Sequence, residues 1–142
     1  SALFSPEERQ EMAQFLVDEM LEAEPEGCPV RVERYSGLTV DFAKHAHAAA
    51  ILRGIRNITD LASETQLAIT NRQVADIETV FIVTGEAYAF TSSSLITQIA
   101  ALGGPLERLS TIVPQLVIDR LRIKRDDPSH PLSRLARDQH VE

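Results

Sequence analysis

The fold is decided by the stretch AAAILRGIR, residues 48–56, and by the segments that follow it. Residues 48–52 have the apolar run of a short buried strand, which ends in two arginines that flank Gly54. The amphipathic pattern of residues 57–74 predicts a long helix, and the apolar run at 79–83 predicts a second strand. Strand and helix in regular exchange indicate an α/β fold, in which a parallel sheet is flanked by helices.

Local signals predict the other elements. Ser5-Pro6-Glu7-Glu8 is a capping box with proline at the first helical position, and it predicts a helix that ends near residues 25–27. Val30, Val32 and Tyr35 alternate with charged residues, which predicts a strand with one buried face. Further helices are predicted over 38–47, over 95–102 with Gly103-Gly104 as terminator, and over 115–124 after Pro114. The first helix carries Met12, Phe15, Leu16, Met20 and Leu21 on one face. In the helix over 57–74 the candidate buried positions are Ile58, Leu61, Leu67, Ala68 and Ile69.

The composition indicates one globular domain, with 44% hydrophobic and 25% charged residues in a chain of 142. A net charge of -7 and a pI near 5.1 argue against a nucleic-acid surface, which needs a basic patch. Any phosphate binding must therefore depend on a few local arginines. The single cysteine, Cys28, excludes an internal disulfide. Because no apolar run approaches the ~20 residues of a membrane span and no signal-peptide pattern opens the chain, we expect a cytoplasmic protein without a membrane partner.

Two segments carry groups that suit phosphate. Arg53 and Arg56 follow the first predicted strand, and ligands of open α/β sheets gather beyond the carboxyl ends of the strands. The arginine fork matches phosphate oxygens, and Gly54 would let the backbone approach a ligand closely. Thr91-Ser92-Ser93-Ser94 follows the second strand and opens a helix, where hydroxyls and free N–H groups suit an anion. The alternatives are solvated surface arginines and an ordinary serine N-cap.

The order and spacing of several stretches match one family over roughly residues 1–125. These stretches are Leu3 to Arg9, Gly37 to Ala43, Leu52 to Arg56, Asp60 with Glu64, Gln66 to Ala68, Asn71-Arg72, Glu78 to Phe81 and Thr91 to Leu95. They resemble the phosphopantetheine adenylyltransferases of coenzyme A biosynthesis, in the nucleotidyltransferase α/β superfamily. The resemblance implies a Rossmann-like fold, a homohexamer, and Mg²⁺ that acts with ATP. The implied reaction transfers the adenylyl group of ATP to 4′-phosphopantetheine and yields dephospho-coenzyme A and pyrophosphate.

The resemblance also implies roles for individual residues. Gly54, Ile55, Arg56 and Glu64 match ATP-contacting positions, as does the segment Tyr88, Ala89, Phe90, Thr91, Ser92, Ser93, Ser94. Thr39, Arg53 and Asn71 match positions that bind the phosphopantetheine substrate. Because adenylyl transfer depends on placing two anions in line and dispersing their charge, we assign catalysis to Arg56 and Ser94. No residue is assigned as a metal ligand, since His45 and His47 are two apart in a predicted helix and point to different sides.

Some of these residues have plainer interpretations. Glu64 and Asn71 lie seven residues apart on nearly the same helix face, which could simply be solvated. Thr39 could cap the helix that follows it, and Tyr88 could be a half-buried loop aromatic.

The family's histidine motif, and the lysine that it places before the stretch beginning at Phe4, have no counterpart in these residues. The chain begins at Ser1 without an initiator methionine, so we expect the first strand–helix–strand portion to precede it, and we predict an enzyme provided that this portion is present. Residues 1–125 would then be the C-terminal part of the α/β domain, and residues 126–142 a polar tail with a short helix around 132–138. The alternatives are a non-catalytic nucleotide or coenzyme A binding module, an inactive fragment, or a nucleotidyltransferase with another acceptor.

Overall fold

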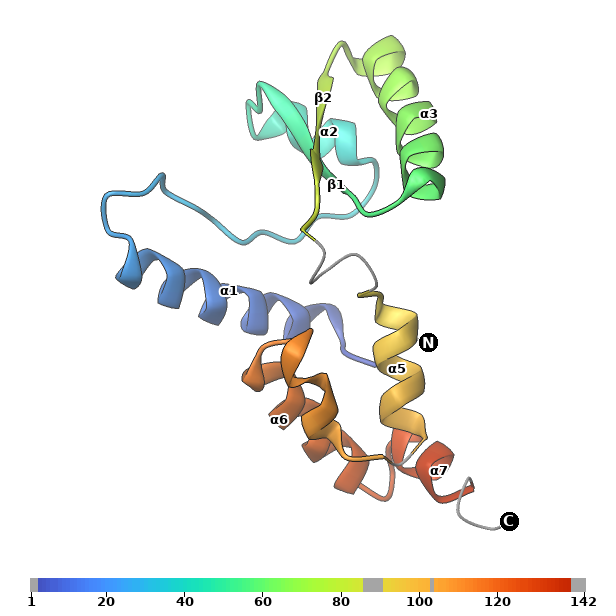
Figure 1. The fold of residues 1–142 in the computed structure, drawn as a ribbon. Coiled ribbons are helices and arrows are strands. Elements are labelled where there is room, and N and C mark those ends of the chain that lie inside the picture. Colours follow the sequence, from blue (N-terminus) through green and yellow to red (C-terminus); the bar gives the residue numbers. More distant parts are fainter. Residues whose placement is uncertain (1–2, 86–90, 103, 139–142) are drawn as a thin grey trace. The chain divides into compact units, whose positions relative to one another are not determined.

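The computed structural model describes residues 3–85, 91–102 and 104–138 (Figure 1). Contacts divide the chain into two compact units, one of residues 35–90 and one of residues 1–34 with 91–142. The helices and strands are α1 (Pro6–Ala23), α2 (Thr39–His45), β1 (Ala50–Ile55), α3 (Ile58–Ala75), β2 (Glu78–Val83), α5 (Ser93–Ala101), the 3₁₀ helix η1 (Leu106–Thr111), α6 (Gln115–Asp126) and α7 (Pro131–Asp138). None of the helices in the described ranges is long and apolar enough to cross a membrane.

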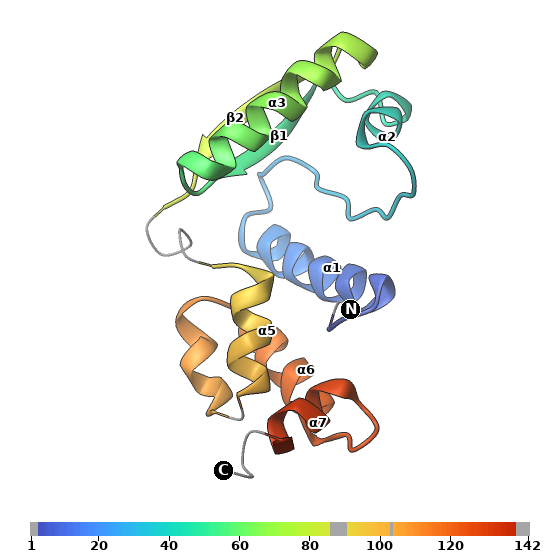
Figure 2. The same ribbon diagram turned by 90° about the vertical axis from the view of Figure 1, so that its right-hand side faces the viewer.

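The unit of residues 35–90 is built on a parallel pair of strands. β1 and β2 pair in register from Ala50 opposite Glu78 to Ile55 opposite Val83, and α3 connects them. Figure 2 shows α3 lying along one face of the strand pair, as a crossover helix does. The predicted α/β class, with parallel strands and a helix on the face, is confirmed at this level.

The helix predicted over 57–74 is present as α3, but its predicted buried positions are mostly wrong. Ile58 is 85% exposed and Ile69 54% exposed, whereas Asn71 and Ala75 are buried. Helical spacing places Glu64, Ala68, Asn71 and Ala75 on one face of α3. This face lies against the strands, although it is not the most apolar face of the helix. The exposed set among the predicted positions is Ile58, Leu61, Leu67 and Ile69.

The first strand is longer and less buried than its sequence predicts. It spans Ala50–Ile55 rather than 48–52, because backbone pairing with β2 continues through Arg53 and Gly54. Leu52 is 62% exposed, so the prediction of a buried strand is wrong for this residue. Alternation along the strand places Leu52 on the face opposite Ile51 and Arg53.

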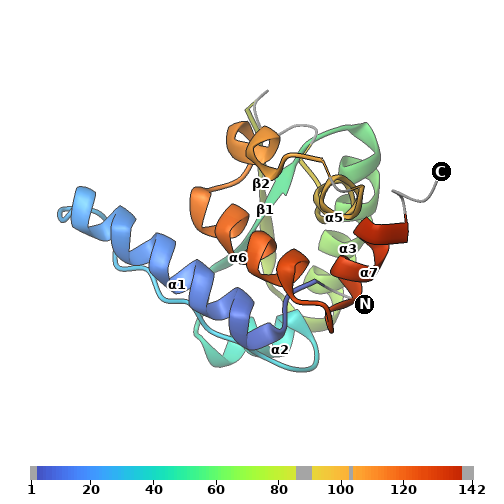
Figure 3. The ribbon, with the colours of Figure 1, turned by 90° about the horizontal axis from the view of Figure 1, so that it is seen from below.

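The other unit is helical and has an aliphatic core. Its largest fully buried side chains are Leu106, Leu109, Ile118, Leu121 and Leu132, which come from η1, α6 and α7, and Ala100 of α5 is fully buried with them. Figure 3 shows α1 beside α6, and two ion pairs join these helices: Lys124 Nζ lies 2.7 Å from Glu8 Oε1, and Arg120 Nη2 lies 2.8 Å from Glu11 Oε1. The predicted capping box is confirmed, since Ser5 Oγ accepts from the Glu8 N–H while the Glu8 carboxylate accepts from the Ser5 N–H.

Several expectations for this unit need correction. Of the five apolar residues predicted to share one face of α1, Met12 is buried, whereas Phe15 is 50% and Met20 46% exposed. Residues 30–35 form no strand; instead the Gln10 side chain donates to the Val32 carbonyl and Arg34 pairs with Glu7, so this segment follows α1. α5 ends at Ala101, and Gly103 of the predicted terminator lies outside the described residues. Helix α6 is confirmed, and so is the short helix within the predicted tail, where Leu132 of α7 is fully buried.

Candidate functional site

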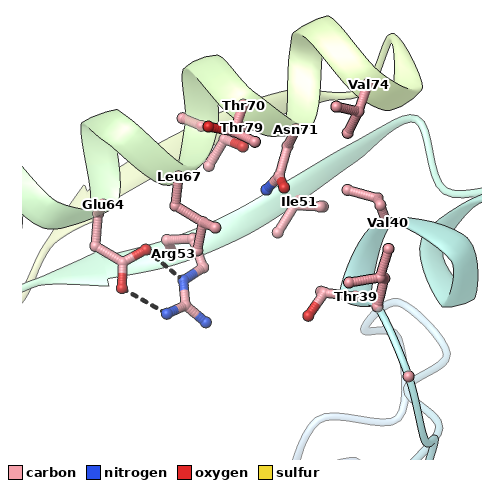
Figure 4. A pocket seen from close by; sticks show the side chains of 13 residues that line it. Thr39, Val40, Ile51, Arg53, Glu64, Leu67, Thr70, Asn71, Val74 and Thr79 are labelled. Atoms are coloured by element: carbon pink, nitrogen blue, oxygen red, sulfur yellow. Dashed lines mark hydrogen bonds and ion pairs between the residues drawn. The ribbon is translucent and has the colours of Figure 1, made fainter.

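One cavity in the unit of residues 35–90 brings together four of the residues predicted to bind substrates. It has a volume of about 400 Å³, and Thr39, Arg53, Glu64 and Asn71 all line it (Figure 4). The walls come from the start of α2, from β1, from the strand-facing side of α3 and from Thr79 of β2. The lining residues are Gly37, Leu38, Thr39, Val40, Ile51, Arg53, Glu64, Leu67, Ala68, Thr70, Asn71, Val74 and Thr79.

Arg53 and Glu64 form a bidentate ion pair at this cavity. Arg53 Nε lies 2.7 Å from Glu64 Oε2, and Arg53 Nη2 lies 2.5 Å from Glu64 Oε1. The hydrogen bonds from Arg53 lower the pKa of Glu64, and those to Glu64 raise the pKa of Arg53. The Arg53 side chain is still 44% exposed and lines the cavity, where its guanidinium can bind an anion.

Asn71 supplies a polar group in an otherwise largely apolar wall. Its side chain points from α3 toward Ile51 and α2 in Figure 4, and the residue is only 8% exposed. Among the described residues, no side-chain hydrogen bond of Asn71 is found, and the residue lines the cavity. The amide is not among the fully buried unpaired side-chain groups of the described residues, so it is open to the cavity and can bind a polar group of a ligand there. The prediction that Glu64 and Asn71 share a helix face is confirmed, and the face lines a cavity.

Thr39 stands at the rim of the cavity, and the capping interpretation is wrong. Leu38 is the N-cap residue of α2, and no side chain caps this helix. The Thr39 hydroxyl instead lies 2.7 Å from the phenolic oxygen of Tyr35. The Tyr35 ring is in turn stacked on Phe42, with centroids 4.7 Å apart and planes 12° apart.

Arg56 follows β1 and is held by Asp60 in the first turn of α3. Arg56 Nε lies 2.8 Å and its backbone nitrogen 3.3 Å from Asp60 Oδ2, and Nη2 lies 3.3 Å from Oδ1. Asn57 fixes Asp60 in turn, since its side-chain oxygen accepts from the Asp60 N–H at 2.8 Å. Hydrogen bonding by Arg56 lowers the pKa of Asp60, and hydrogen bonding by Asp60 raises the pKa of Arg56. Arg56 is therefore more than a solvated surface arginine, because Asp60 holds its guanidinium in one orientation.

Gly54 and Ile55, between the two arginines, contribute backbone rather than polar side chains. Ile55 is 6% exposed, and its carbonyl accepts from the Thr84 N–H at 3.0 Å. A Cβ atom at Gly54 would lie 3.4 Å from the Thr84 methyl group, which is a tight but tolerable distance. The fold of this unit therefore does not by itself require glycine at this position.

The serine motif belongs to the other unit. Ser92 is the N-cap of α5 and accepts from the Leu95 N–H at 3.1 Å, so the capping interpretation is confirmed for this serine. Ser93 and Ser94 form the exposed first turn, and Thr91 is partly buried ahead of it. Tyr88, Ala89 and Phe90 of the predicted ATP segment lie outside the described residues.

No cluster in the described ranges has three or more His, Cys, Asp or Glu side chains placed to hold a metal ion. His45 is the last residue of α2, and His47 lies just beyond it with a left-handed φ of 52°. Cys28 is exposed.

The observed architecture is that of an α/β protein whose cavity pairs a cationic group with a neutral amide. Its sequence is 43% identical over 129 residues to a phosphopantetheine adenylyltransferase of Rhodopirellula baltica, covering 90% of this chain and 68% of the relative. The corresponding enzyme of Moorella thermoacetica is 40% identical over 124 residues, covering 87% and 71%. That of Geobacter sulfurreducens is 36% identical over 129 residues, covering 90% and 73%. The chain matches no protein-family model. With these relatives, it belongs to the phosphopantetheine adenylyltransferase family.

The sequence reasoning missed three residues of this site. Asp60 was part of the family match but had no role, although its position four residues after Arg56 favours an ion pair. The sequence pattern places Tyr35 in a strand, and its spacing of four from Thr39 carries no signal without a helix that spans both residues. Thr79 lies in β2, and its buried hydroxyl has no hydrogen-bond partner in the described structure. Only its pairing with Ile51 across the strands points to the cavity, and the sequence alone does not show this pairing.

Proposed function

We propose that this protein transfers the adenylyl group of ATP to 4′-phosphopantetheine. An oxygen of the acceptor phosphate attacks the α-phosphorus of ATP, the bond from that phosphorus to the bridging oxygen breaks, and dephospho-coenzyme A and pyrophosphate result. The observation that carries the proposal is the gathering of Thr39, Arg53 and Asn71 in one cavity of about 400 Å³. Family membership supports the same reaction.

The cavity suits both ends of the acceptor. Arg53 supplies a planar fork of donors for the terminal phosphate, and this phosphate would compete with the Glu64 carboxylate for it. The apolar side chains of Ile51 and Leu67 fit the carbon chain of the pantetheine arm, and the Asn71 amide can pair with one of its amide groups.

Arg56 and Ser94 are the residues to which we assign stabilisation of the reacting phosphates. Asp60 holds the Arg56 guanidinium in one orientation, which lowers the cost of ordering it when ATP binds. Gly54, Ile55 and Glu64, with residues 88–94, complete the proposed ATP contacts. No nucleophilic side chain is needed, because the acceptor phosphate is itself the nucleophile.

Mg²⁺ fits this site as an ion that is carried by ATP. The carboxylates of Asp60 and Glu64 are engaged by arginines, so neither is a ready metal ligand, and magnesium commonly binds through phosphates and waters. When bound, it would neutralise the developing charge on pyrophosphate. We further propose a cytoplasmic homohexamer with a Rossmann-like nucleotidyltransferase fold in residues 1–125, without a nucleic-acid or membrane partner.

The direct test measures pyrophosphate release with ATP and either 4′-phosphopantetheine or nicotinamide mononucleotide. We expect release with 4′-phosphopantetheine only, and a large loss of turnover in Arg56→Ala. Release with nicotinamide mononucleotide alone would assign another acceptor. Binding of ATP without release under either condition would identify a binding module and overturn the proposal.

A further inference from the structure

The turn that leads into α7 places the imidazole of His130 at the start of that helix. Pro131 is the first helical residue and has no N–H, so the first backbone donor that α7 leaves without a partner inside the helix is that of Leu132. The Nδ1 atom of His130 accepts from this N–H at 3.2 Å. His130 thus caps α7, a task for which serine, threonine, aspartate and asparagine are the usual residues.

Backbone contacts on both sides hold His130 in this place. Its N–H donates to the carbonyl of Asp127, the C-cap residue of α6, at 3.1 Å, and its own carbonyl accepts from the Ser133 N–H at 3.1 Å. Asp127 closes the turn between them, because its Oδ1 atom accepts from the Ser129 N–H at 2.9 Å and from the Ser129 hydroxyl at 2.7 Å. The cap is therefore part of an ordered turn.

The first turn of α7 contributes to the core of its unit. Helix α7 packs on α5 and α6 (Figure 2), and the Leu132 side chain, next to the capped N–H, is 0% exposed. It belongs to the same buried cluster as Ala100 and Leu121. Loosening this turn would withdraw Leu132 from the core, so the cap acts on the docking of the whole helix.

This cap depends on the charge of the imidazole. Nδ1 can accept a hydrogen bond only while the imidazole is neutral, since both ring nitrogens carry hydrogens in the charged form. Histidine changes charge between pH 5 and 8, which serine or asparagine at the same position would not do. The positive end of the helix dipole also disfavours a cation there, and Arg134, whose guanidinium donates to the Ser129 carbonyl at 3.4 Å, adds a like charge nearby.

The helices packed against α7 bring few other charges to this turn. Helix α5 has no titratable side chain. The charged residues at the end of α6 are Lys124, Arg125, Asp126 and Asp127. Lys124 Nζ lies 2.7 Å from Glu8 Oε1, and Arg125 Nη1 donates to the Gly104 carbonyl at 2.8 Å, so both cations have partners away from the turn.

Asp127 is the group that attracts a charged His130. The Ser129 hydroxyl contributes most to the lowered pKa of Asp127, and His130 contributes as a nearby charge. Because the two residues are three apart along the chain, this attraction is present whether or not α7 is docked. The bond to the Leu132 N–H, by contrast, exists only in the formed helix, so it alone ties the charge of His130 to docking.

We propose that His130 is a pH-sensitive latch that holds α7 on the core of its unit. Neutral His130 caps the Leu132 N–H, and protonation removes the acceptor and releases the first turn of the helix. The stability from this bond is present above the pH range in which the imidazole titrates and is lost as pH falls through it. The latch is independent of the proposed reaction.

The test is amide hydrogen exchange followed by NMR at pH 7.5 and 5.5. Carboxylates keep their charge over this interval, so histidines dominate the change. Protection factors of the Leu132, Ser133 and Arg134 amides should fall about three- to tenfold at pH 5.5, the effect of losing one cap, while that of Leu121 in α6 stays within about twofold. A long-range ¹H–¹⁵N spectrum at pH 7.5 should show His130 neutral, with its hydrogen on Nε2.

Variants separate the latch from general acid sensitivity. His130→Asn keeps an acceptor that does not titrate, so its α7 protection should be the same at both pH values. His130→Ala should be poorly protected at both. The matched control is His45→Asn, at the exposed end of α2 in the other unit, which should keep the pH dependence of the original protein. Equal protection of the original protein at both pH values, a pH dependence that persists in His130→Asn, or a hydrogen on Nδ1 at pH 7.5 would each overturn the latch.

Discussion

Replacing Arg53 should weaken the binding of the acceptor, 4′-phosphopantetheine, far more than the binding of ATP. In Arg53→Ala the substrate phosphate loses charge-assisted hydrogen bonds that contribute about 1.5–3 kcal/mol. Since the Arg53 side chain is 44% exposed, solvent screening favours the lower part of this range. The substitution also leaves Glu64 unpaired beside the cavity, where its charge would repel the phosphate by about 1 kcal/mol more. Together these effects predict a KM for 4′-phosphopantetheine raised about 50- to 100-fold.

Two further variants separate the contributions of charge and geometry. Arg53→Lys keeps the charge but loses the planar fork, so its KM should rise only about tenfold. Arg53→Ala/Glu64→Gln should recover part of the loss, because the unpaired carboxylate is gone. Arg72→Lys is the matched control, since Arg72 pairs with Glu78 at the surface, with both side chains more than 60% exposed. The assay is steady-state pyrophosphate release at saturating ATP, and a KM within twofold of the original in Arg53→Ala would refute the reasoning.

Three other substitutions test separate parts of the structure. Asp60→Asn should lower kcat about tenfold and leave the KM for 4′-phosphopantetheine unchanged, because the Arg56 guanidinium loses the ion pair that orients it. An unaltered kcat would show that Asp60 has no role in positioning Arg56. Arg53 lowers the pKa of Glu64, so the stability that this pair contributes is present above the ordinary glutamate pKa of about 4.3 and is lost as pH falls through the folded value. Urea midpoints of Glu64→Gln should accordingly depend less on acid pH than those of the original protein, and an identical pH dependence would contradict this. Leu121→Ala should cost about 2–5 kcal/mol of unfolding free energy, because Leu121 is fully buried, whereas Ile123→Ala on the same helix, at 65% exposure, should cost under about 0.5 kcal/mol; equal urea midpoints would argue against the described core.

The sequence predicted the elements whose signals are local. The capping box at Ser5 and the proline before α6 fixed the starts of two helices, because caps depend on a few adjacent residues. The long helix after Asn57 was also found, since its length and cap outweigh an ambiguous apolar pattern.

Tertiary contacts decided what the local pattern could not. Alternating Val30 and Val32 resemble a strand, but a strand needs a pairing partner, and the backbone near Val32 accepts from Gln10 instead. The buried face of α3 carries Asn71 rather than Ile69, because the position of the strands decides which face is covered.

The same limit applies to the site. Arg53, Glu64 and Asn71 could be chosen by family resemblance, but their meeting in one cavity depends on how α3 crosses β1. The Tyr35 contact to Thr39 joins an irregular segment to a helix start, so no periodic pattern marks it. Asp60 was the residue that charge spacing alone could have identified.

The most direct test of the central claim is a titration of the protein with 4′-phosphopantetheine, followed by the side-chain amide signal of Asn71 in a ¹H–¹⁵N correlation spectrum. The proposed cavity predicts a saturable shift of this signal, since the Asn71 amide lines the cavity and a bound ligand changes its surroundings. Arg53→Ala should move the same transition to much higher ligand concentration. An Asn71 signal that stays fixed while pyrophosphate release proceeds would place the acceptor elsewhere and contradict the central claim.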